Sequence, residues 1–322
     1  MQKILSKSLS EYPTYKSNSP KLITHLSRMK EIIERQRQFF NSNQTKSVTF
    51  RKEQLIKLRL ALKNYEPELT GGVYKDFQKG TFNTFLTEFS GLYGELDNAI
   101  NNVKSWARTK RIRTNMANSP GDSYEIPEPL GVCLVIGAWN YPINLALAPA
   151  IAAIAAGNTI VLKPSELTVH TTAAIAKMVR ESFDPSFMTV VEGGVPETTE
   201  LLAQKFDKIF FTGSVPVGRI VYQAAVKHLT PVILELGGKS PLIVAEDANL
   251  KTVVKRLVWG KFVNAGQTCV APDYVYVHRN IEEQFLEVLK DEIIRSQFSL
   301  KNENWKDKSI INLPRQIIYT MT

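Results

Sequence analysis

Residues 208–218 read Lys-Ile-Phe-Phe-Thr-Gly-Ser-Val-Pro-Val-Gly, the pattern of a short apolar strand, a glycine turn and the start of a helix. Pro216 suits the first helical turn, because the N–H that proline lacks would have no partner there. The free N–H groups and the dipole of such a helix end favour a diphosphate. The spacing of Gly213 and Gly218 differs from the usual Gly-x-Gly-x-x-Gly fingerprint, so a plain strand–helix turn is an equally good interpretation of this stretch alone.

Strands and helices alternate on both sides of this stretch. We expect strands at 132–136, 159–162, 188–191, 208–211 and 232–236. We expect helices between them at 145–156, 169–183, 198–206 and 217–227. Short apolar strands that alternate with helices predict an α/β fold with a doubly wound parallel sheet and helices on both faces. Ligands of such sheets bind at the carboxyl ends of the strands, so the residues that follow each strand are the functional candidates.

Helical periodicity dominates the first third of the chain and predicts a helical N-terminal layer packed against the sheet. One helix is expected at 29–40, a second after a cap at Thr49, and a third from Thr84 to about Lys110. A strand is expected at 123–126, just before the sheet begins.

The alternation resumes after Gly237 and Gly238, the expected hinge, and predicts a second α/β domain. Its strands are expected at 242–245 and 274–277, and its helices at 250–263 and 282–294. Residues 238–322 are few for a closed hydrophobic core, so we expect this second domain to be incomplete and the chain to stop part-way through it.

The composition is that of a globular protein. Hydrophobic residues make up 43% of the chain and charged residues 22%, and the net charge of +9 is spread over helical faces, so no nucleic-acid partner is expected. No apolar run is long enough to span a bilayer. Two cysteines do not form a disulfide framework, so we expect a reducing, cytoplasmic location. Residues 1–28 are expected to form a disordered tail, with a weak targeting segment as the alternative.

Polar residues follow several of the expected strands. Lys163 and Glu166 come after strand 159–162, where a cation can reach a phosphate and a carboxylate can accept hydrogen bonds from ribose hydroxyls. An ion pair within the loop is the alternative for Glu166. Glu235 lies at the end of strand 232–236, where partial desolvation would raise the pKa of its carboxyl group toward the range of a general base. A structural glutamate with satisfied partners is the alternative. The two glycines that follow it, Gly237 and Gly238, indicate a close approach of the backbone, for example to a ligand.

Asn140 follows strand 132–136 and carries an amide that can donate to an oxyanion, with a helix cap as the alternative. Cys269 ends the stretch Phe-Val-Asn-Ala-Gly-Gln-Thr-Cys, directly after an expected helix. A thiol on a glycine-containing loop can face a cleft and react as a thiolate, and a buried apolar thiol is the alternative. Burial is our expectation for Cys133, within strand 132–136. The four histidines lie away from Cys269 in sequence, and no Cys/His spacing predicts a metal site.

Five motifs together resemble those of the aldehyde dehydrogenase superfamily, and the helical start Glu34-Arg35-Gln36-Arg37 resembles its class 3 branch, which includes the fatty aldehyde dehydrogenases. The motifs are Trp139-Asn140-Tyr141-Pro142, Lys163-Pro164-Ser165-Glu166, Phe211-Thr212-Gly213-Ser214, Glu235-Leu236-Gly237-Gly238 and Gly266-Gln267-Thr268-Cys269. Each motif alone is unspecific, whereas five in the same order and spacing are highly specific. The resemblance covers roughly residues 29–312.

The resemblance implies an oxidoreductase that converts an aldehyde to a carboxylic acid with NAD or NADP. By this resemblance Cys269 is the nucleophile, Glu235 is the general base, and Asn140 with the backbone N–H of Cys269 forms the oxyanion hole. It places residues 29–237 in a cofactor-binding domain with N-terminal helices and residues 238–322 in a partial catalytic domain. The residues implied at the cofactor are Gly213, Ser214, Val215, Pro216, Val217 and Gly218 under the diphosphate, and Lys163 and Glu166 at the adenine ribose.

The chain also departs from the family pattern. It has no Phe-Gly-Pro segment of the kind that grips the nicotinamide ribose. We expect the β-hairpin arm and the C-terminal tail of the family's homodimer to be missing, which makes the chain a C-terminally truncated fragment with weak cofactor binding and poor turnover. Two alternatives stay open: an inactive dinucleotide-binding remnant, and a cofactor-independent thioesterase or acyltransferase that uses Cys269.

Overall fold

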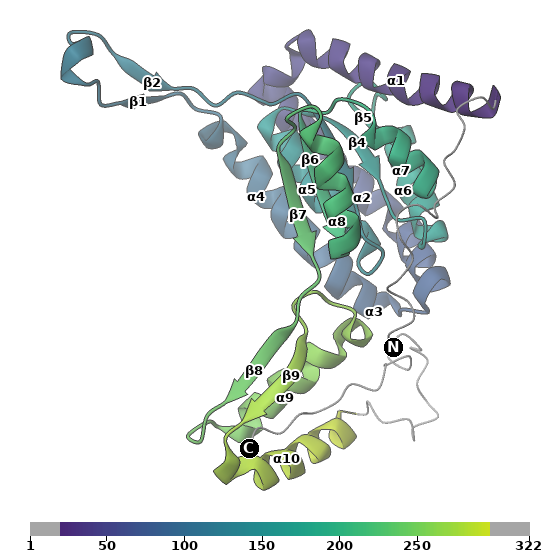
Figure 1. The fold of residues 1–322 in the computed structure, drawn as a ribbon, viewed down its shortest axis with the longest axis vertical. Coiled ribbons are helices and arrows are strands. Elements are labelled where there is room, and N and C mark those ends of the chain that lie inside the picture. Colours follow the sequence, from purple (N-terminus) through teal and green to yellow (C-terminus); the bar gives the residue numbers. More distant parts are fainter. Residues whose placement is uncertain (1–19, 297–322) are drawn as a thin grey trace.

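A five-stranded parallel sheet lies at the centre of the computed structural model, which describes residues 20–296 (Figure 1). Its strands stand in the order β5, β4, β3, β6, β7. They are β3 (Val132–Ile136), β4 (Thr159–Lys163), β5 (Met188–Val190), β6 (Lys208–Gly213) and β7 (Val232–Leu236). Every residue of β3 and β4 is buried, as expected for strands that are covered on both faces. The predicted parallel sheet is confirmed.

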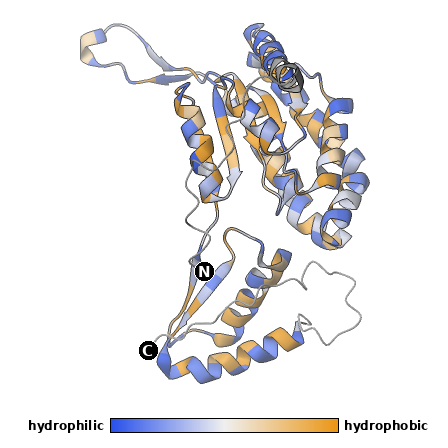
Figure 2. Cartoon of the chain, turned by 45° about the vertical axis from the view of Figure 1, so that its right-hand side comes forward, coloured by the Kyte–Doolittle hydropathy of each residue, from blue (hydrophilic) through white to orange (hydrophobic). Residues whose placement is uncertain are grey.

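Helices cover both faces of this sheet, which confirms the doubly wound fold. One face carries α2 (Val48–Phe77), α4 (Ser90–Trp106), α5 (Pro142–Ala156) and α6 (Val169–Ser182). The other carries α1 (Pro20–Asn41), α7 (Val195–Leu202) and α8 (Val215–Val226). Val135 belongs to the first core and Leu134 to the second, because successive residues of a strand point to opposite faces. Figure 2 shows the apolar character of the strands between these helix layers.

The chain reverses its direction of travel through the sheet between β3 and β6. From β3 it proceeds to β4 and β5, and then crosses back to place β6 on the other side of β3. Ligands of open α/β sheets bind outside the carboxyl ends of the strands at such a switch point. Gly137 and Ser214 directly follow these two strands, so the region beside them is where a ligand site is expected.

The helical layer differs in detail from its prediction. α2 is capped by Ser47, whose Oγ accepts a hydrogen bond from the Phe50 N–H (3.3 Å), so the cap predicted at Thr49 was wrong by two residues. The single helix expected from Thr84 is instead divided into α3 (Thr81–Thr84), a π turn (Phe85–Phe89) and α4, which ends at Trp106. The π turn rotates the helix by part of a turn and buries Glu88, which is a consequence that helical periodicity alone does not contain.

The five-stranded sheet and the helices on its two faces form the sheet body. A two-stranded antiparallel hairpin projects from this sheet body (Figure 1). Its strands are β1 (Lys110–Ile112) and β2 (Ser123–Glu125), paired with Arg111 opposite Tyr124. Residues near Lys110 were expected to end a helix, and no hairpin was expected in this chain. Pairing with a strand more than ten residues away decides the conformation of β1, so its own three residues carried no usable signal.

A smaller carboxyl-terminal unit, residues 240–295, follows β7. It contains the parallel strands β8 (Ser240–Val244) and β9 (Pro272–Val277), with helices α9 (Leu250–Phe262) and α10 (Glu282–Arg295). Its core, which includes Val254, Val275 and Phe285, is a cluster separate from the two cores of the sheet body. The predicted second α/β unit therefore exists as a structural element with its own apolar centre.

Some expectations fall at or beyond the limits of the described residues. α1 begins at Pro20, so it includes residues that we placed in the tail 1–28. Residues 1–19 and 297–322 lie outside the described part of the chain. Between them, no helix has both the length and the apolar character needed to cross a membrane.

Candidate active site

Asn140 contacts the loop that carries Cys269, although the two lie far apart in the sequence. The Asn140 side-chain amide donates a hydrogen bond to the backbone carbonyl of Gln267 (2.8 Å). The side-chain amide of Asn264 in turn donates to the backbone carbonyl of Asn140 (2.8 Å). The segment after β3 and the segment after α9 are therefore joined by a reciprocal pair of amide hydrogen bonds.

The backbone of this loop makes an abrupt turn before the thiol. Asn264, Ala265 and Gly266 all have left-handed conformations, with φ angles of 53°, 57° and 74°. Glycine adopts this region at no cost, whereas Ala265 has a β-carbon that disfavours it by roughly 1–2 kcal/mol. The Gln267 side chain donates to the carbonyl of Asn264 (2.9 Å) and closes the turn. The turn ends α9 and directs the chain to Cys269.

The two cysteines have opposite environments, as expected from their sequence positions. Cys269 is exposed, so the alternative of a buried apolar thiol does not hold for it. Cys133 is buried within β3, and burial raises the pKa of its thiol to about 12, with the charge of Asp207 adding to the effect. Cys269 is therefore the accessible thiol of the described residues, and Cys133 is part of the core.

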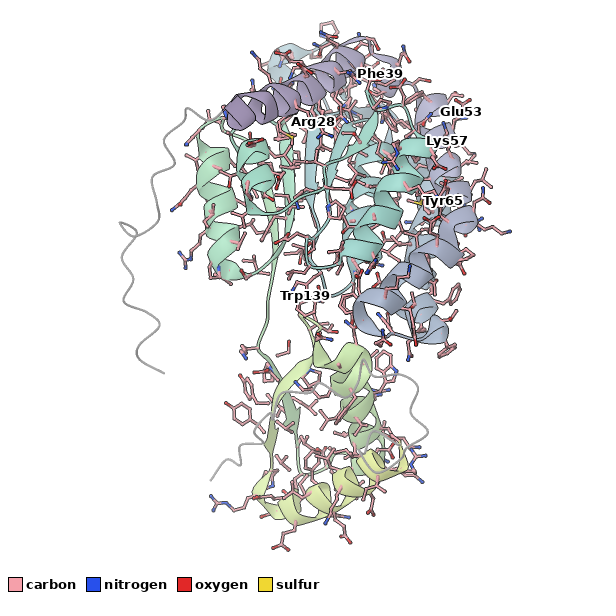
Figure 3. All side chains as sticks on the ribbon, turned by 90° about the vertical axis from the view of Figure 1, so that its right-hand side faces the viewer. Arg28, Phe39, Glu53, Lys57, Tyr65 and Trp139 are labelled. Carbon is pink, nitrogen blue, oxygen red and sulfur yellow. The ribbon has the colours of Figure 1, made fainter. Side chains whose placement is uncertain are left out.

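The turn after Glu235 meets the backbone of Cys269. A β-carbon built on Gly238 would lie only 2.4 Å from the Cys269 carbonyl oxygen, so only glycine fits here without a shift of the backbone. The close approach predicted from the Gly237-Gly238 pair is present, and the atoms approached belong to the chain itself. Gly238 and Cys269 thus come together at the junction between the sheet body and the carboxyl-terminal unit, and Glu235 lies three residues before Gly238 in the chain. Figure 3 shows this junction, with Trp139 labelled beside it.

The environment of Glu235 differs from its prediction. We expected a partly desolvated carboxylate, and its side chain is exposed. β7 is the edge strand of the sheet, and its residues alternate between half-buried and exposed, because within the described residues nothing covers one of its faces. The predicted desolvation of Glu235 is therefore wrong for this structure.

Two residues that the sequence motifs included without a role also belong to the site. The Tyr141 hydroxyl forms a short hydrogen bond with the hydroxyl of Thr268, the residue before Cys269. Burial is the main cause that raises the pKa of Tyr141, and negative charge at Glu88 and Cys269 raises it further. Their adjacency to Asn140 and Cys269 was the only sequence signal for these two side chains.

The loop that carries Cys269 is called the thiol loop below. A cavity of about 420 Å³ opens beside it. Leu86, Tyr141, Trp259, Thr268 and Val270 are among the residues that line it, so its wall is mainly apolar. Thr268 and Val270 flank Cys269 in the chain, which places the cavity next to the thiol. It joins side chains of the sheet body to side chains of the carboxyl-terminal unit.

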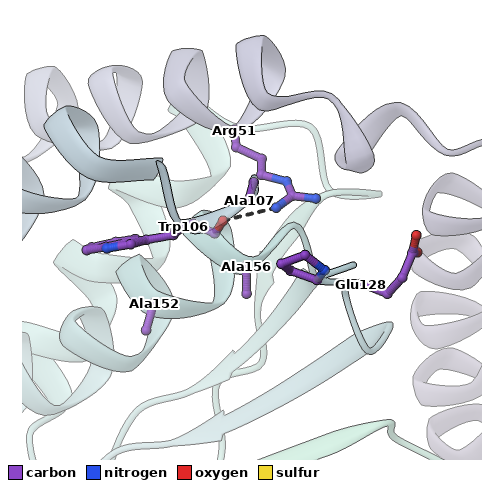
Figure 4. Close-up of a pocket in the computed structure, with 8 residues that line it drawn as sticks. Arg51, Trp106, Ala107, Glu128, Ala152 and Ala156 are labelled. Atoms are coloured by element: carbon purple, nitrogen blue, oxygen red, sulfur yellow. Dashed lines mark hydrogen bonds between the residues drawn. The ribbon is translucent and has the colours of Figure 1, made fainter. Parts of the chain in front are cut away.

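A second cavity, of about 400 Å³, lies away from these residues and is shown in Figure 4. Arg51 is one of the residues that line it, and its buried guanidinium donates to the backbone carbonyls of Thr45 (2.8 Å) and Ala155 (3.3 Å). Arg51 therefore satisfies the Ala155 carbonyl at the end of α5, where a helix leaves its last acceptors without partners, and joins it to the segment of Thr45. This arrangement is accounted for by the fold.

The remaining candidate residues lie at the ends of β4 and β6. Lys163 is only 1% exposed, and its ammonium donates to the Pro164 carbonyl (2.9 Å) and lies 3.8 Å from the Glu166 carboxylate. Burial lowers the pKa of Lys163, while the charges of Glu166 and Glu197 oppose that shift. The loop ion pair considered for Glu166 is therefore present.

The turn between β6 and α8 has the features predicted for a phosphate-binding helix end. Ser214 occupies the N-cap position of α8, and its side chain accepts no hydrogen bond from the helix. Pro216 lies in the first turn, as expected. A β-carbon on Gly213 would lie 2.5 Å from the Phe211 ring, and one on Gly218 would lie 2.9 Å from Leu236. The absence of a side chain at Gly218 lets α8 pack closely on β7, and its absence at Gly213 leaves room for the Phe211 ring of the same strand.

The candidate residues follow four adjacent strands at the same edge of the sheet. Lys163 ends β4, Asn140 follows β3, Gly213 ends β6 and Glu235 lies at the end of β7. Hydrogen bonds and packing bring Asn140, Gly238 and Cys269 into one cluster, whereas Lys163 and Glu166 form a second cluster. Among the described residues, no group of three or more His, Cys, Asp or Glu side chains is placed to hold a metal ion.

Comparisons with known proteins give consistent matches. Residues 25–307 match the Aldehyde dehydrogenase family. A Staphylococcus aureus protein named "4,4'-diaponeurosporen-aldehyde dehydrogenase" is 46% identical over 251 residues, which cover 78% of this chain and 55% of that protein. A Rattus norvegicus protein named "Aldehyde dehydrogenase, dimeric NADP-preferring" is 44% identical over 265 residues, which cover 82% of this chain and 58% of that protein.

Solved structures show the same similarity. The structure described as "Substrate bound state of Staphylococcus Aureus AldH" matches with a TM-score of 0.83 at 42% identity, covering 87% of this chain and 61% of that one. A Mycobacterium tuberculosis aldehyde dehydrogenase complexed with NAD+ matches with a TM-score of 0.74 at 27% identity, covering 84% of this chain and 56% of that one. The chain therefore spans less than two thirds of the length of these proteins.

Proposed function

This chain belongs to the aldehyde dehydrogenase family, and we propose on that basis that its site oxidises an aldehyde to a carboxylic acid with NAD or NADP. One observation carries the proposal: the segments after β3, β7 and α9 converge on the thiol. Asn140 bonds to Gln267, and Gly238 lies against the Cys269 carbonyl, so three motifs from distant parts of the sequence share one place. Convergence of this kind is expected of a reaction centre and is not required by the fold.

The first step is the addition of the Cys269 thiolate to the aldehyde carbon. A carbon–sulfur bond forms, and the carbonyl oxygen becomes an oxyanion. Asn140 uses one N–H to hold Gln267, and its amide has a second N–H for the oxyanion. The backbone N–H of Cys269 is the second donor. Both donors belong to segments that hydrogen bonds hold together, which favours a preorganised oxyanion hole.

The residues at the ends of β4 and β6 fit a dinucleotide cofactor. The first turn of α8 has no side-chain cap, so its N–H groups suit a diphosphate, and Gly213 to Gly218 form that turn. The Lys163 ammonium keeps donors beyond the one used on Pro164, and Glu166 is exposed beside it for ribose hydroxyls. Bound NAD or NADP would supply the acceptor for the hydride that leaves the substrate carbon.

The second half of the reaction is the hydrolysis of the thioester left on Cys269. Glu235 takes a proton from water, the hydroxide adds to the thioester carbon, and the carbon–sulfur bond breaks to release the acid and the thiolate. The exposure of Glu235 gives water direct access to its carboxylate. Gly238, three residues after Glu235, packs against the Cys269 carbonyl, so the segment that carries the base contacts the loop that carries the nucleophile.

The cavity beside Cys269 supports an apolar substrate. Its wall includes Leu86, Trp259 and Val270 and contains few charged groups, so a hydrocarbon chain or ring would displace poorly bound water there. The aldehyde group would then lie toward Thr268 and Cys269. The Staphylococcus aureus relative is named "4,4'-diaponeurosporen-aldehyde dehydrogenase", and this name agrees with an aldehyde as the substrate.

A second copy of the chain is the proposed protein partner. The hairpin projects from the body and exposes large apolar side chains, including Met116 (96% exposed), Tyr124 and Ile112. Exposed apolar surface on a projecting arm favours burial against another protein. The rat relative is named as dimeric. We expected this arm to be missing, and the hairpin of this chain is instead its candidate.

The test is to supply purified protein with apolar aldehydes and NAD or NADP, and to follow the absorbance of the reduced nicotinamide. Cys269→Ser should lower turnover by at least about a thousandfold, because a hydroxyl is far less ionised than a thiol. The same variant should bind the cofactor as the wild type does. Cys133→Ala, at the other cysteine, is the matched control and should retain turnover. Near wild-type turnover in Cys269→Ser would refute the assignment. Thioester hydrolysis without cofactor would favour the acyltransfer alternative, and binding without turnover would favour the remnant.

A further inference from the structure

A buried ion pair lies beneath the segment that carries Asn140. The Lys79 ammonium is 3.7 Å from the Glu88 carboxylate, with side chains that are 2% and 0% exposed. Glu88 belongs to the π turn Phe85–Phe89, and single π turns are frequent at functional sites. The pair joins α2 and its following turn to the helix that begins after Tyr141, and the proposed reaction steps do not use it.

Glu88 of this pair binds the first turn of α5. The Glu88 carboxylate accepts hydrogen bonds from the N–H groups of Ile143 (3.2 Å) and Asn144 (2.9 Å). These are first-turn donors of a helix whose own N-cap residue, Tyr141, provides no side-chain cap. A carboxylate at the positive end of a helix dipole is stabilising there. Glu88 is thus the cap of α5, supplied by another element.

Lys79 completes the support by contacting Tyr141 directly. Its ammonium lies over the Tyr141 ring, 5.0 Å from the ring centroid, which is within the range of a cation–π interaction. The hydroxyl at the other end of the ring bonds to Thr268. One rigid side chain therefore connects a buried cation to the residue that precedes Cys269.

We propose that Lys79 and Glu88 are positioning residues that fix Asn140 and Tyr141 and, through the Tyr141–Thr268 hydrogen bond, set the conformation of the loop that carries Cys269. The proposal rests on the proposed role of Cys269 as nucleophile. Neither residue touches the reacting atoms. Their effect passes through contacts that join one segment to another.

The backbone of the thiol loop explains why it needs such a support. Asn264 and Ala265 occupy left-handed conformations that cost free energy, so the turn persists only where its surroundings hold it. Three side-chain contacts hold it from the β3 side: Asn140 to Gln267, Asn264 to Asn140, and Tyr141 to Thr268. A buried ion pair is seldom more stabilising than an apolar pair of the same size, so its use here favours a role in geometry over a role in stability.

Hydrogen–deuterium exchange of the full chain tests the proposal without any assay of activity. The central variant is Lys79→Met with Glu88→Gln, which removes both charges and keeps both shapes, so the protein stays folded. Exchange at the Gln267 and Ala271 amides, which bond to Asn264 and Thr268, should rise by about fivefold or more. The amides of β3 and β4 should not change. The control is Arg37→Met with Asp207→Asn, which removes an ion pair at the amino-terminal ends of β3 and β6, away from the thiol loop.

Two further variants trace the path. Tyr141→Phe removes only the hydroxyl and should raise exchange at Gln267 and Ala271 in the same way. When Tyr141→Phe is combined with Lys79→Met and Glu88→Gln, exchange at these amides should rise little further, because all these changes break the same chain of contacts. Thr268→Val, a substitution at a half-buried loop residue, should in return raise exchange at Ile143 and Asn144, since coupling between two sites is reciprocal.

Three outcomes would overturn the proposal. The first is a folded Lys79→Met/Glu88→Gln variant whose amide exchange at the thiol loop equals that of the wild type. The second is an equal rise of exchange at the thiol loop in the Arg37→Met/Asp207→Asn control. The third is an effect of Tyr141→Phe on exchange that adds in full to the effect of Lys79→Met/Glu88→Gln. Each of these results leaves the proposed aldehyde oxidation untouched, because exchange is measured without substrate or cofactor. Loss of turnover in Cys269→Ser tests that function separately.

Discussion

Gly238 is the residue at which the smallest change should have a large local effect. A β-carbon there would lie 2.4 Å from the Cys269 carbonyl oxygen, so one of the two backbones must move. Gly237, its neighbour, has no atom within 4 Å of the equivalent position. The two adjacent glycines therefore form an internal comparison of close approach with open space.

We predict that Gly238→Ala lowers the free energy of unfolding by about 1–3 kcal/mol and slows alkylation of the Cys269 thiol, because the loop must shift. Gly237→Ala should change stability by no more than about 0.5 kcal/mol. Urea unfolding and the rate of iodoacetamide labelling measure the two effects, with Cys269→Ser as the blank. Equal behaviour of the two alanine variants would contradict the contact.

Glu235→Gln should impair the hydrolysis of the thioester more than the formation of reduced cofactor. An amide fills the same space but takes no proton from water, so deacylation should slow by about a hundredfold or more. Stopped-flow absorbance should record a burst of reduced cofactor followed by slow turnover. Glu283→Gln, an exposed glutamate on α10, is the control. Loss of the burst itself would place Glu235 earlier, in the deprotonation of Cys269.

At the scale of elements, the junction of the π turn with α5 has a titratable centre. Burial raises the pKa of Glu88 from 4.5 to about 7, and the charge of Lys79 and the N–H groups of Asn144 and Ile143 oppose the shift. The native state therefore binds a proton more tightly than the unfolded chain. The stability that this proton contributes is fully present below pH 4.5 and is lost as pH rises toward about 7.

We predict that the free energy of unfolding of the wild type falls between these two pH values by on the order of 3 kcal/mol relative to Glu88→Gln, which carries no proton to lose. Chemical unfolding at a pH below 4.5 and at a pH above 7 measures the difference. Asp207→Asn is the comparison for a carboxylate elsewhere in the sheet body. A wild type and a Glu88→Gln variant with parallel pH profiles would show that Glu88 does not titrate in this range.

At the scale of the whole molecule, the chain has cores of unequal size. The sheet body is held by two extensive apolar clusters on the two faces of its sheet. The carboxyl-terminal unit is held by a small cluster around Val254, Val275 and Phe285, and its two-stranded sheet has one partner for each strand. Less buried apolar area means less stabilisation against the same loss of chain entropy per residue.

We predict that residues 250–295 lose their exchange protection at lower urea concentrations than residues 132–236. Hydrogen–deuterium exchange in a urea series resolves the two parts of one chain, because local opening exposes amides before global unfolding does. Phe285→Ala, in the small core, should widen the gap, and Leu134→Ala, in the body, should narrow it. One coincident transition for both ranges would mean that the two parts unfold as a single cooperative unit.

Local patterns were sufficient to predict the central architecture. The apolar runs of β3 and β4 and the helices between strands are properties of neighbouring residues, and parallel strands bring their carboxyl ends to one edge without further information. Asn140, Lys163, Gly213 and Glu235 could be placed at that edge for this reason. The glycine pair after Glu235 indicated a close approach, although not which atoms are approached.

Contacts between distant segments decided the rest. The Tyr141–Thr268 and Asn140–Gln267 bonds each span 127 residues, and no periodicity encodes such a pairing. The exposure of Glu235 follows from the place of β7 at the sheet edge, and the burial of Glu88 from a π turn that changes which face of a helix points inward. A sequence reports which side chains a segment has. Their solvent exposure and their partners depend on the elements that pack against them, and only the assembled fold supplies those.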